Sequence, residues 1–282
     1  MRGVRLLLVL LAVRAVTAAG AEPVAEPELW FPVGEQLVYR IYWGRIPVGI
    51  SYVTTGWVEQ DGRKLLRIRY RTRTNRFLSK LYPVDDTIEA LIEPRSFLPV
   101  RFTKNLSEGR HRKLEVTAFD HAHTNAVWTS VLKNKTQVFA IEPDTRDLVT
   151  FTYFMRKHVS QPGSRAQYRV MADDRIYDVW LQAGAVEPVR LPVYGDVDSV
   201  RIDPEAAFEG LFVRTGKLSL WSSQDARRVM TRGVAAVPVG SVRVILVDVN
   251  GPGDDFWTQR GPSGEYEEEG VGVTNAPVVP AP

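Results

Sequence analysis

Hydrophobic and polar residues alternate along most of the chain. In the first half, short segments alternate β-branched or aromatic residues with polar ones, and Gly, Pro or Asn separates the segments. Period-two patterns predict β-strands, because successive side chains of a strand point to opposite faces of its sheet. The first six predicted strands are Glu35–Trp43, Gly49–Val58, Lys64–Thr74, Asp86–Ile92, Pro99–Lys104 and His111–Asp120.

One segment near the middle of the chain follows a different period. Residues 143–158 place apolar side chains at helical intervals, which predicts a helix with Asp144 as its N-cap. Alternation then resumes. The later predicted strands are Ala166–Ala172, Arg175–Ala183, Val186–Tyr194, Asp198–Ile202, Gly216–Trp221, Arg227–Arg232 and Gly240–Val249.

A sheet of this many strands must curl, close or stack to bury its apolar face. The regular spacing of about ten residues favours an antiparallel meander over alternating strands and helices. We therefore expect a mainly β fold: a curved antiparallel sheet or partly open β-barrel with one central helix.

The N-terminus predicts export. Arg2 and Arg5 precede an apolar run, Leu6–Val13, and small residues follow at Ala19–Ala21, which is the order found in a secretory signal peptide. The run is far shorter than the roughly 20 residues that span a bilayer. We predict a signal peptide over residues 1–21 and a single β-rich domain over 22–250. The alternative, a poorly cleaved membrane anchor, rests on Arg14, which weakens the apolar region.

Charge changes this picture little. The chain has 36 Lys and Arg against 33 Asp and Glu, a net charge of +3, but residues 1–21 hold three of the arginines and no acid. Without them the chain is formally neutral, so charge gives no argument for nucleic-acid binding. Residues 251–282 combine six acids with many Gly and Pro, which predicts a disordered tail.

The chain has no cysteine. An exported protein of this composition forms no disulfide and lacks the lipidated cysteine of a bacterial lipoprotein. We predict a periplasmic or secreted protein that is not an integral membrane protein once the signal peptide is removed.

Three motifs resemble the bacterial exported domain of unknown function 3108 family. They are "FPVGEQLVYRIYWGRIPVGISYV", "LYPVDDTIEALIEPRSFLPVRF" and "GKLSLWSSQDARRVMTRGVAAVPVGSVRVIL", and they occur in this order between about residues 30 and 250. The matching positions are Gly34-Glu35, Tyr39, Trp43, Gly49, Tyr82, Asp86, Gly216, Leu218, Trp221, Asp225, Arg227, Arg228 and Gly240-Ser241. Residues 124–161 depart most from the pattern, apart from the helix that ends in Arg156. The resemblance implies a secreted or periplasmic β-rich domain with no established activity.

The last motif carries the first candidate site. Trp221 ends a predicted strand, Asp225 lies in a polar turn, and Arg227 and Arg228 begin the next strand. We favour a hairpin in which Asp225 caps the turn and pairs with one arginine while Trp221 packs on the core. The alternative is a ligand site in which Trp221 stacks on a sugar and Asp225 and an arginine bind its polar groups.

A row of arginines forms the second candidate site. Arg67, Arg69, Arg71 and Arg73 occupy every second position of one predicted strand, so all four lie on one face. We call them the arginine row. Like charges this close repel unless they are paired, and we expect partners such as Asp86 and Glu89 in a neighbouring strand. The alternative is an anion-binding wall for lipid headgroups or acidic glycans.

Other chemistry has weaker support. His121 and His123 beside Asp120 have the residue types of a zinc or iron site, but the segment is where a hairpin tip is expected. In a strand the adjacent acids Asp85 and Asp86 would face opposite ways, and the pair at 173–174 reads as a turn. No phosphate-binding glycine loop, HExxH or Gly-x-Ser-x-Gly motif occurs. We predict no cofactor, no metal site and no catalytic residue.

Strand-borne aromatics such as Tyr39, Tyr42 and Trp43 are the side chains with which β-sheet proteins hold sugars or acyl chains. Three hypotheses follow. The first is a non-catalytic binding module for a lipid-like or glycan ligand in the concavity of the sheet. The second is a structural or assembly factor of the cell envelope that acts through protein contacts. The third is a carboxylate-dependent hydrolase of envelope polysaccharide.

Overall fold

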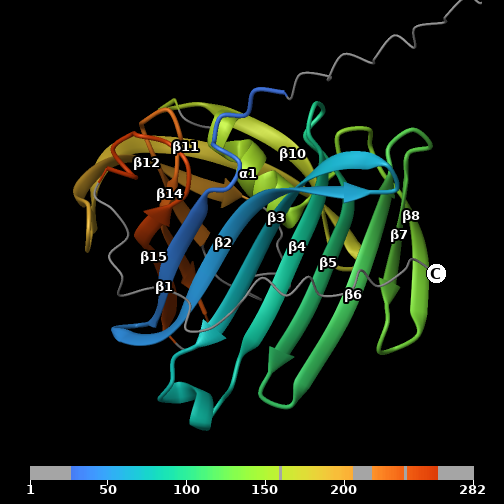
Figure 1. Cartoon of the computed structure of the whole chain (residues 1–282), viewed down its shortest axis with the longest axis horizontal. Helices are drawn as coiled ribbons and strands as arrows, with labels where there is room; N and C mark the ends of the chain where they lie inside the picture. The colour runs from blue at the N-terminus through green and yellow to red at the C-terminus, as the bar shows by residue number, and fades with distance from the viewer. Residues whose placement is uncertain (1–26, 159–160, 206–217, 238–239, 260–282) are drawn as a thin grey trace, which may run out of the picture.

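The computed structural model describes residues 27–158, 161–205, 218–237 and 240–259. Its strands form one 15-stranded sheet (Figure 1). They are β1 (Gln36–Trp43), β2 (Ile46–Gln60), β3 (Arg63–Thr74), β4 (Asp85–Glu93), β5 (Leu98–Glu108), β6 (His111–Asp120), β7 (Asn125–Ser130), β8 (Lys135–Ala140), β9 (Arg146–Asp147), β10 (Arg165–Ala172), β11 (Arg175–Leu191), β12 (Gly195–Glu205), β13 (Leu218–Ser223), β14 (Met230–Ala236) and β15 (Ser241–Asn250). The predicted signal peptide, residues 1–21, lies outside the described residues.

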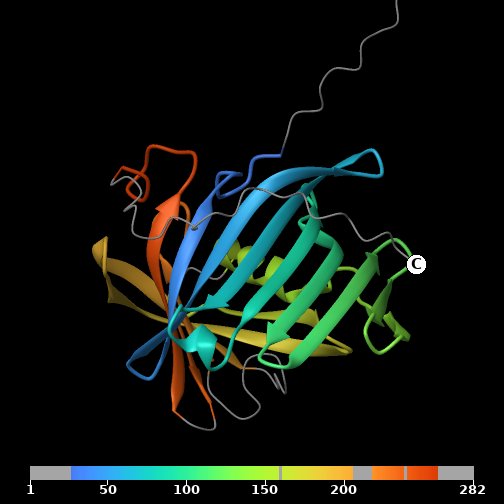
Figure 2. The ribbon, with the colours of Figure 1, turned by 60° about the horizontal axis from the view of Figure 1, so that its bottom comes forward.

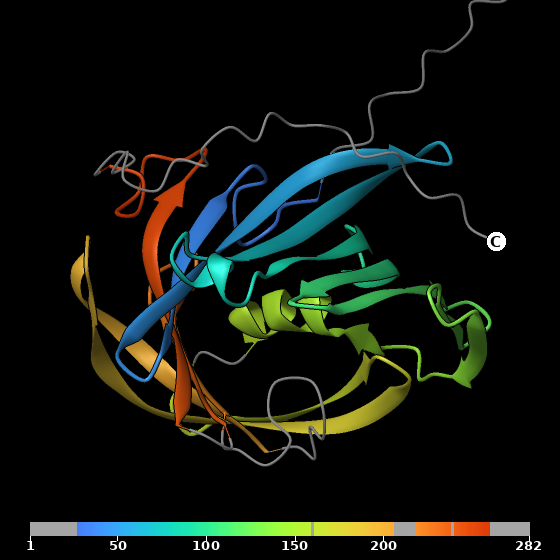
Figure 3. The same cartoon turned by 90° about the horizontal axis from the view of Figure 1, so that it is seen from below.

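The order of the strands places the first and the last strand side by side in the middle of the sheet. The order is β8-β7-β6-β5-β4-β3-β2-β1-β15-β14-β13-β12-β11-β10-β9, so β1 pairs with β15 and the edges are β8 and β9. Neighbours are antiparallel except β9 and β10, which are parallel. The sheet curls around the α-helix α1 (Leu148–His158) without closing (Figures 2 and 3). The predicted fold, a curved or partly open β-barrel with one central helix, is confirmed.

The predicted strands are present, with differences at particular places. The segments predicted as two strands, 175–183 and 186–194, form one strand, β11, because a register shift between Ala183 and Val186 absorbs the interruption. Strands β7 and β8 were not predicted, although Ala126 and Trp128 of β7 are buried. Strand β14 begins at Met230 and not at Arg227.

Helix α1 begins later than predicted. Its N-cap is Asp147 and not Asp144, because the Asp147 carboxylate accepts the backbone N–H groups of Val149 and Thr150 at 2.7 and 3.0 Å. The Thr150 hydroxyl donates to the same carboxylate. The preceding residues, Arg146 and Asp147, form the short strand β9. Among the described residues, no helix has the length and apolar composition needed to cross a bilayer.

The cap makes stability depend on pH. Burial raises the pKa of Asp147 to about 6, although its hydrogen bonds with Val149 and Thr150 oppose the shift. As pH falls from 7 to 4, Asp147 of the folded chain binds a proton, whereas in the unfolded chain the same carboxyl group is protonated only near its ordinary pKa of 3.8. Protonation therefore stabilises the fold at low pH, and this stabilisation is lost as pH rises through about 6. In Asp147→Asn we expect the contribution to disappear. The difference in unfolding free energy between variant and wild type, from urea titrations, should shift by roughly 2–3 kcal/mol in favour of the variant between pH 4 and pH 7. Parallel pH profiles would contradict the assignment.

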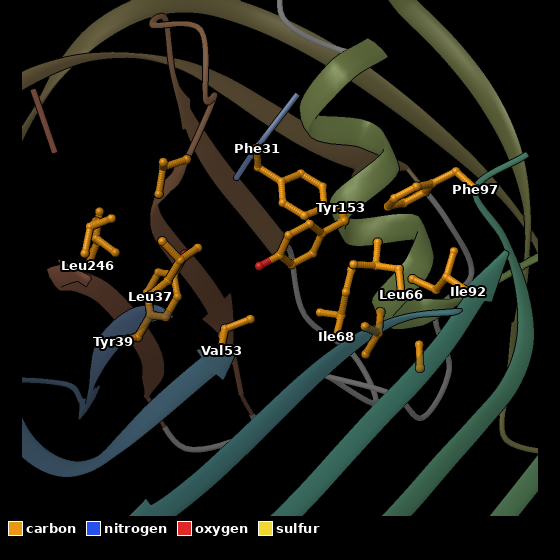
Figure 4. Close-up of a cluster of buried hydrophobic side chains, with 14 of the residues drawn as sticks. Phe31, Leu37, Tyr39, Val53, Leu66, Ile68, Ile92, Phe97, Tyr153 and Leu246 are labelled. Carbon is orange, nitrogen blue, oxygen red and sulfur yellow. The ribbon is translucent and has the colours of Figure 1, made fainter. Parts of the chain in front are cut away.

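The main core lies between α1 and the inner face of strands β1–β4 (Figure 4). Tyr153 of α1 lies next to Phe31 in this cluster, and the two rings pack edge to face with centroids 4.9 Å apart (Figure 4). The other side of α1 packs on β10–β12 through a second buried cluster that includes Phe151 and Met155. The helix is therefore packed on two sides by the curled sheet.

Residues 251–259 belong to the folded domain, so the prediction of disorder from residue 251 was wrong for them. Trp257 is 1% exposed and packs on Tyr194 with ring centroids 5.0 Å apart. Gly251 has a φ of 114°, and a Cβ there would lie 2.5 Å from the Gly34 carbonyl oxygen, so the two ends of the domain touch. The rest of the predicted tail, residues 260–282, lies outside the described residues.

Candidate functional site

The turn after β13 is tied to α1 and to the start of β1 by buried charges. Nη1 of Arg156, in the last turn of α1, lies 2.8 Å from Oε1 of Glu35, and the two side chains are 1% and 0% exposed. The other nitrogens of Arg156 donate to the carbonyls of Arg227 and Arg228 at 2.9 and 3.1 Å. The Tyr153 hydroxyl donates to the same Glu35 oxygen at 3.2 Å. One arginine thus joins three segments that are far apart in sequence.

Arg227 extends this network to the C-terminal segment. Its Nη1 lies 3.9 Å from Oε2 of Glu35, and its Nε pairs with the carboxylate of Asp255. Its Nη2 donates to the carbonyl of Pro252 at 2.8 Å. We call Glu35, Arg156, Arg227 and Asp255 the charge cluster. It links four parts of the chain: the segment before β1, the helix, the β13–β14 turn and the segment after β15.

Arg156 keeps its charge although it is buried. Burial alone would lower the pKa of Arg156, but the adjacent Glu35 carboxylate raises it, and the guanidinium stays charged. Burial, reinforced by Glu35, raises the pKa of Tyr153, so its phenol stays a donor. Within the described chain, Oε2 of Glu35 and Nη1 of Arg227 have no hydrogen-bond partner. Buried charges are costly unless paired, so the removal of one member leaves the others destabilising.

The motif around Trp221 forms the predicted turn with different contacts. Asp225 accepts the backbone N–H of Arg227 at 2.8 Å, which is its predicted capping role. The predicted ion pair between Asp225 and an arginine was wrong, because the guanidinium of Arg227 belongs to the charge cluster and that of Arg228 donates to the carbonyl of Lys157. Arg228 has a φ of 49°, so the chain is still turning there and β14 starts two residues later.

Trp221 itself is held on all sides. It is 5% exposed, its indole N–H donates to the Glu187 carboxylate, and the Arg232 guanidinium lies 3.6 Å from its ring centroid. Arg232 also pairs with Glu187 at 2.9 Å. A ring with these neighbours has little surface left for stacking on a ligand, so the hairpin interpretation accounts for Trp221.

The arginine row lies on the outer face of β3, because Leu66 and Ile68, the neighbours of Arg67, point into the core (Figure 4). Arg69 pairs with Glu89 at 3.0 Å, as expected. Arg71 and Arg73 both pair with Asp85, at 3.3 and 3.4 Å, and not with Asp86.

Register explains the change of partner. Asp86 lies opposite Thr72, a residue between two members of the row, and therefore faces inward. Among the described residues Arg67 has no ion pair. Three of the four arginines thus have an ion-pair partner within the sheet, with Arg71 and Arg73 sharing one carboxylate, which favours the solvated outer face over an anion-binding wall.

The inner face changes from apolar to polar along β3. Side chains that lie side by side across neighbouring strands form rows on this face. The row under α1 is Ile68, Ala90 and Phe102, the next is Tyr70, Ile88, Lys104 and Glu115, and the last is Tyr39, Ser51, Thr72 and Asp86. We call Tyr39, Ser51, Tyr70, Thr72 and Asp86 the inner polar site. Its side chains project from the inner face of β1–β4, close enough to Arg156 of α1 and to Glu35 for Tyr39 and Tyr70 to interact with their charges.

Two tyrosines of this site have unused hydroxyls. Tyr39 is 8% exposed and Tyr70 is half-buried, and neither hydroxyl has a hydrogen-bond partner in the described parts of the chain. Burial raises the pKa of both phenols, and each also feels the charges of Arg156 and Glu35. Both therefore stay protonated and able to donate. Nearby, the Ser51 and Thr72 hydroxyls lie 2.8 Å apart and bond to each other.

Asp86 adds a carboxyl group at the rim of the site. It accepts the backbone N–H of Ser107 at 2.7 Å. Burial raises the pKa of Asp86, and the neighbouring carboxylates of Glu108 and Asp85 raise it further. The inner polar site thus offers phenol and aliphatic hydroxyls and one carboxyl group, which are groups suited to binding a hydroxyl-bearing molecule.

A second group of charges bridges the open side of the sheet. Lys104 of β5 and Lys113 of β6 donate to opposite oxygens of Asp173, at 2.7 and 3.1 Å. Lys113 also pairs with Glu115 at 2.9 Å. Asp173 lies in the turn between β10 and β11, as predicted for the pair at 173–174. Burial would raise the pKa of its carboxyl group, but the two lysines together hold it below the usual value. The bridge fixes the two halves of the sheet across the gap.

The histidines show no metal geometry. Both ring nitrogens of His121 lie at hydrogen-bond distance from backbone carbonyls, those of Pro143 and Pro99, and His123 pairs with Asp120 at 2.8 Å. Residues 121–124 are the turn between β6 and β7, as predicted. Throughout the described residues, no group of three or more His, Asp or Glu side chains could hold a metal ion.

Sequence reasoning missed the charge cluster and most of the inner polar site. Glu35 and Arg156 were noted only as positions of family resemblance. One signal was available in the sequence. Glu35 lies two residues before the apolar pair Leu37 and Val38, so a charged residue stands directly at the start of a buried strand. Tyr39 was named among the aromatics that could face a groove, and it does face the interior.

An open, curled sheet with a helix inside defines a β-barrel-like domain. The family described as "Protein of unknown function (DUF3108)" matches residues 38–247, and the chain belongs to this family. No curated protein matches the sequence.

Two solved structures resemble the fold. The β-barrel-like protein of domain of unknown function DUF1849 from Brucella abortus superposes with a TM-score of 0.52 at 12% identity, over 78% of this chain and 98% of that one. A Bacteroides fragilis protein named as exported, with a YmcC-like fold, gives a TM-score of 0.31 at 8% identity, over 78% and 96% of the two chains. The first likeness shows the fold alone, and the second carries no argument.

Proposed function

We propose that the protein is an exported, non-catalytic binding module of the cell envelope, periplasmic or secreted, which holds a ligand at the inner polar site. The observation that carries the proposal is the pair of unused phenol hydroxyls at Tyr39 and Tyr70. Each phenol hydroxyl can donate and accept a hydrogen bond, and a bond of this kind contributes about 1 kcal/mol. A ligand that bonds to both hydroxyls gains both contributions.

The surroundings indicate the chemistry of the ligand. Hydroxyl groups and Asp86 form the last row, the next row combines Val53 and Ile88 with polar side chains, and the row under α1 is apolar, with Ile68, Ala90 and Phe102. Such a change from polar to apolar fits an amphiphile, a lipid-like molecule whose polar part carries sugar or polyol hydroxyls. The arginine row and the Trp221 motif are not needed for this site, because the row lies on the outer face of β3 and Trp221 is bound by Glu187 and Arg232.

Removing the two hydroxyls tests the proposal. The double variant Tyr39→Phe/Tyr70→Phe keeps both rings and their packing. With about 1 kcal/mol for each lost hydrogen bond, we expect roughly tenfold or greater weakening of ligand binding. Native mass spectrometry of the protein purified from a bacterial envelope fraction should show a bound molecule on the wild type and loss of most of it in the variant.

A matched control is Tyr52→Phe. Tyr52 is a buried tyrosine of the intervening strand β2, but it lies opposite Arg71 on the outer face. We therefore expect the Tyr52→Phe variant to keep the bound molecule. A bare wild-type protein would overturn the proposal. So would a ligand that survives in the double variant, and so would one lost from Arg69→Ser/Arg71→Ser instead, because that result places binding on the outer face.

A further inference from the structure

Three connections of the meander come together at one end of the molecule. They are the β1–β2 hairpin, the β3–β4 connection with its 3-10 helix η1 (Leu78–Lys80), and the β5–β6 turn, which project from the lower edge of the sheet in Figure 1. Backbone hydrogen bonds join them: the N–H of Asn75 donates to Val48 at 2.9 Å and that of Gly109 to Pro83 at 2.7 Å. They therefore form one continuous, fixed surface.

This end exposes large apolar side chains. Phe77 is 78% exposed, Leu81 76%, Ile46 62%, Tyr82 52% and Trp43 49%. We call these five residues the apolar tip. Single exposed hydrophobic residues are ordinary on a protein surface, but a group of them on adjoining connections marks an interaction site. Aromatic rings with one apolar and one polar edge, such as Trp and Tyr, are the side chains favoured at membrane interfaces.

Cations surround the apolar tip. The exposed basic residues of the same three connections are Arg45, Arg76, Lys80, Arg110 and Arg112. Of the nearby acids, Asp85 is already paired with two arginines of the outer face, and Asp86 faces inward. Glu108 is half-buried at the end of β5. The outward charge of this end is therefore positive, which complements the headgroups of anionic phospholipids.

We propose that the apolar tip inserts into the surface of an anionic phospholipid bilayer, with the surrounding arginines and lysine on the headgroups. Phe77 and Leu81 flank η1 and enter the boundary between headgroups and acyl chains, as the apolar residues of interfacial segments do. The protein binds from the side and does not cross the membrane. This binding goes beyond the proposed function and does not require the inner polar site to hold a ligand.

Co-sedimentation of the purified chain with vesicles tests this surface. We expect binding to vesicles of phosphatidylglycerol and phosphatidylcholine mixed in equal parts, at least tenfold weaker binding to phosphatidylcholine alone, and weakening of the first by added salt. The variant Phe77→Ser/Leu81→Ser should bind the mixed vesicles at least tenfold less. Arg76→Ser/Lys80→Ser should lose the preference for the anionic lipid.

Matched controls separate this surface from general stickiness. Val138→Ser/Val186→Ser removes two exposed apolar side chains from other parts of the sheet, and Arg63→Ser/Arg95→Ser removes two cations from the opposite end. Both should bind the mixed vesicles like the wild type. The proposal is overturned by absence of binding to mixed vesicles, by equal binding to both vesicle types, or by controls that lose binding as much as the tip variants. The variant Tyr39→Phe/Tyr70→Phe should bind vesicles like the wild type. Ligand binding at the inner polar site and membrane binding by the apolar tip are therefore tested separately.

Discussion

Replacing Glu35 by alanine is expected to lower the free energy of unfolding by about 3–5 kcal/mol, a large part of the stability of a domain. The change leaves the guanidinium of Arg156 buried without its carboxylate, and it removes one of the two carboxylates beside Arg227. It also takes the acceptor from the Tyr153 hydroxyl. Urea denaturation followed by fluorescence measures the loss.

Glu89→Ala is the matched control. It also removes a glutamate from an ion pair with arginine, that of Arg69, but on the half-exposed outer face. Pairs of that kind contribute about 0–1 kcal/mol. A similar loss in both variants would show that burial of the charge cluster contributes nothing particular. In the double variant Glu35→Gln/Arg156→Met we expect a smaller loss than the sum of the two single changes, because neither charge is then left alone.

Replacing Trp257 by alanine is expected to destabilise the domain by about 3–5 kcal/mol, the range for truncating a buried aromatic residue. Trp257 is 1% exposed, its carbonyl accepts the Tyr194 hydroxyl at 3.2 Å, and its ring packs on Tyr194. Loss of the ring also loosens the segment that carries Asp255, the partner of Arg227. The same urea titrations give the magnitude.

Its neighbour Phe256 provides the comparison. Phe256 is 44% exposed, so Phe256→Ala removes a ring of similar size from the same segment while giving up much less buried surface. We expect less than half the loss seen for Trp257→Ala. Equal effects of the two changes would mean that residues 251–259 do not pack on the domain as described.

Alternation predicted the strands well because most of them have one buried and one solvated face. In β6, Glu115, Thr117 and Phe119 are buried and the residues between them are more exposed, so a period of two is visible in the sequence. In β8 five of six residues are exposed, and an edge strand of this kind has no apolar face to reveal it. A bulge such as that in β11 looks like a strand end, since the chain changes phase there.

Period alone cannot tell which face of a strand is concave or which residues meet across the fold. The arginine row was correctly placed on one face of β3. The pairing of its members depended on the register with β4, and the same register decided that Asp85 and not Asp86 lies on their face. The charge cluster depended on contacts between residues more than 100 positions apart, such as Glu35 and Arg156. No local pattern encodes such a contact. The capping role of Asp225, by contrast, is local, and the sequence predicted it.

The pairing of β1 with β15 has a consequence for the order in which the chain folds. Two meanders, β1–β8 and β10–β15, can each assemble from short connections as they leave a ribosome or a translocation channel. The seam between them joins residues some 200 positions apart, such as Leu37 and Val249, and closing so long a loop is slow. Until Ser241–Asn250 emerges, β1 is an open edge that can pair with another chain. A nascent polypeptide of this kind needs protection from aggregation until its last strand has arrived.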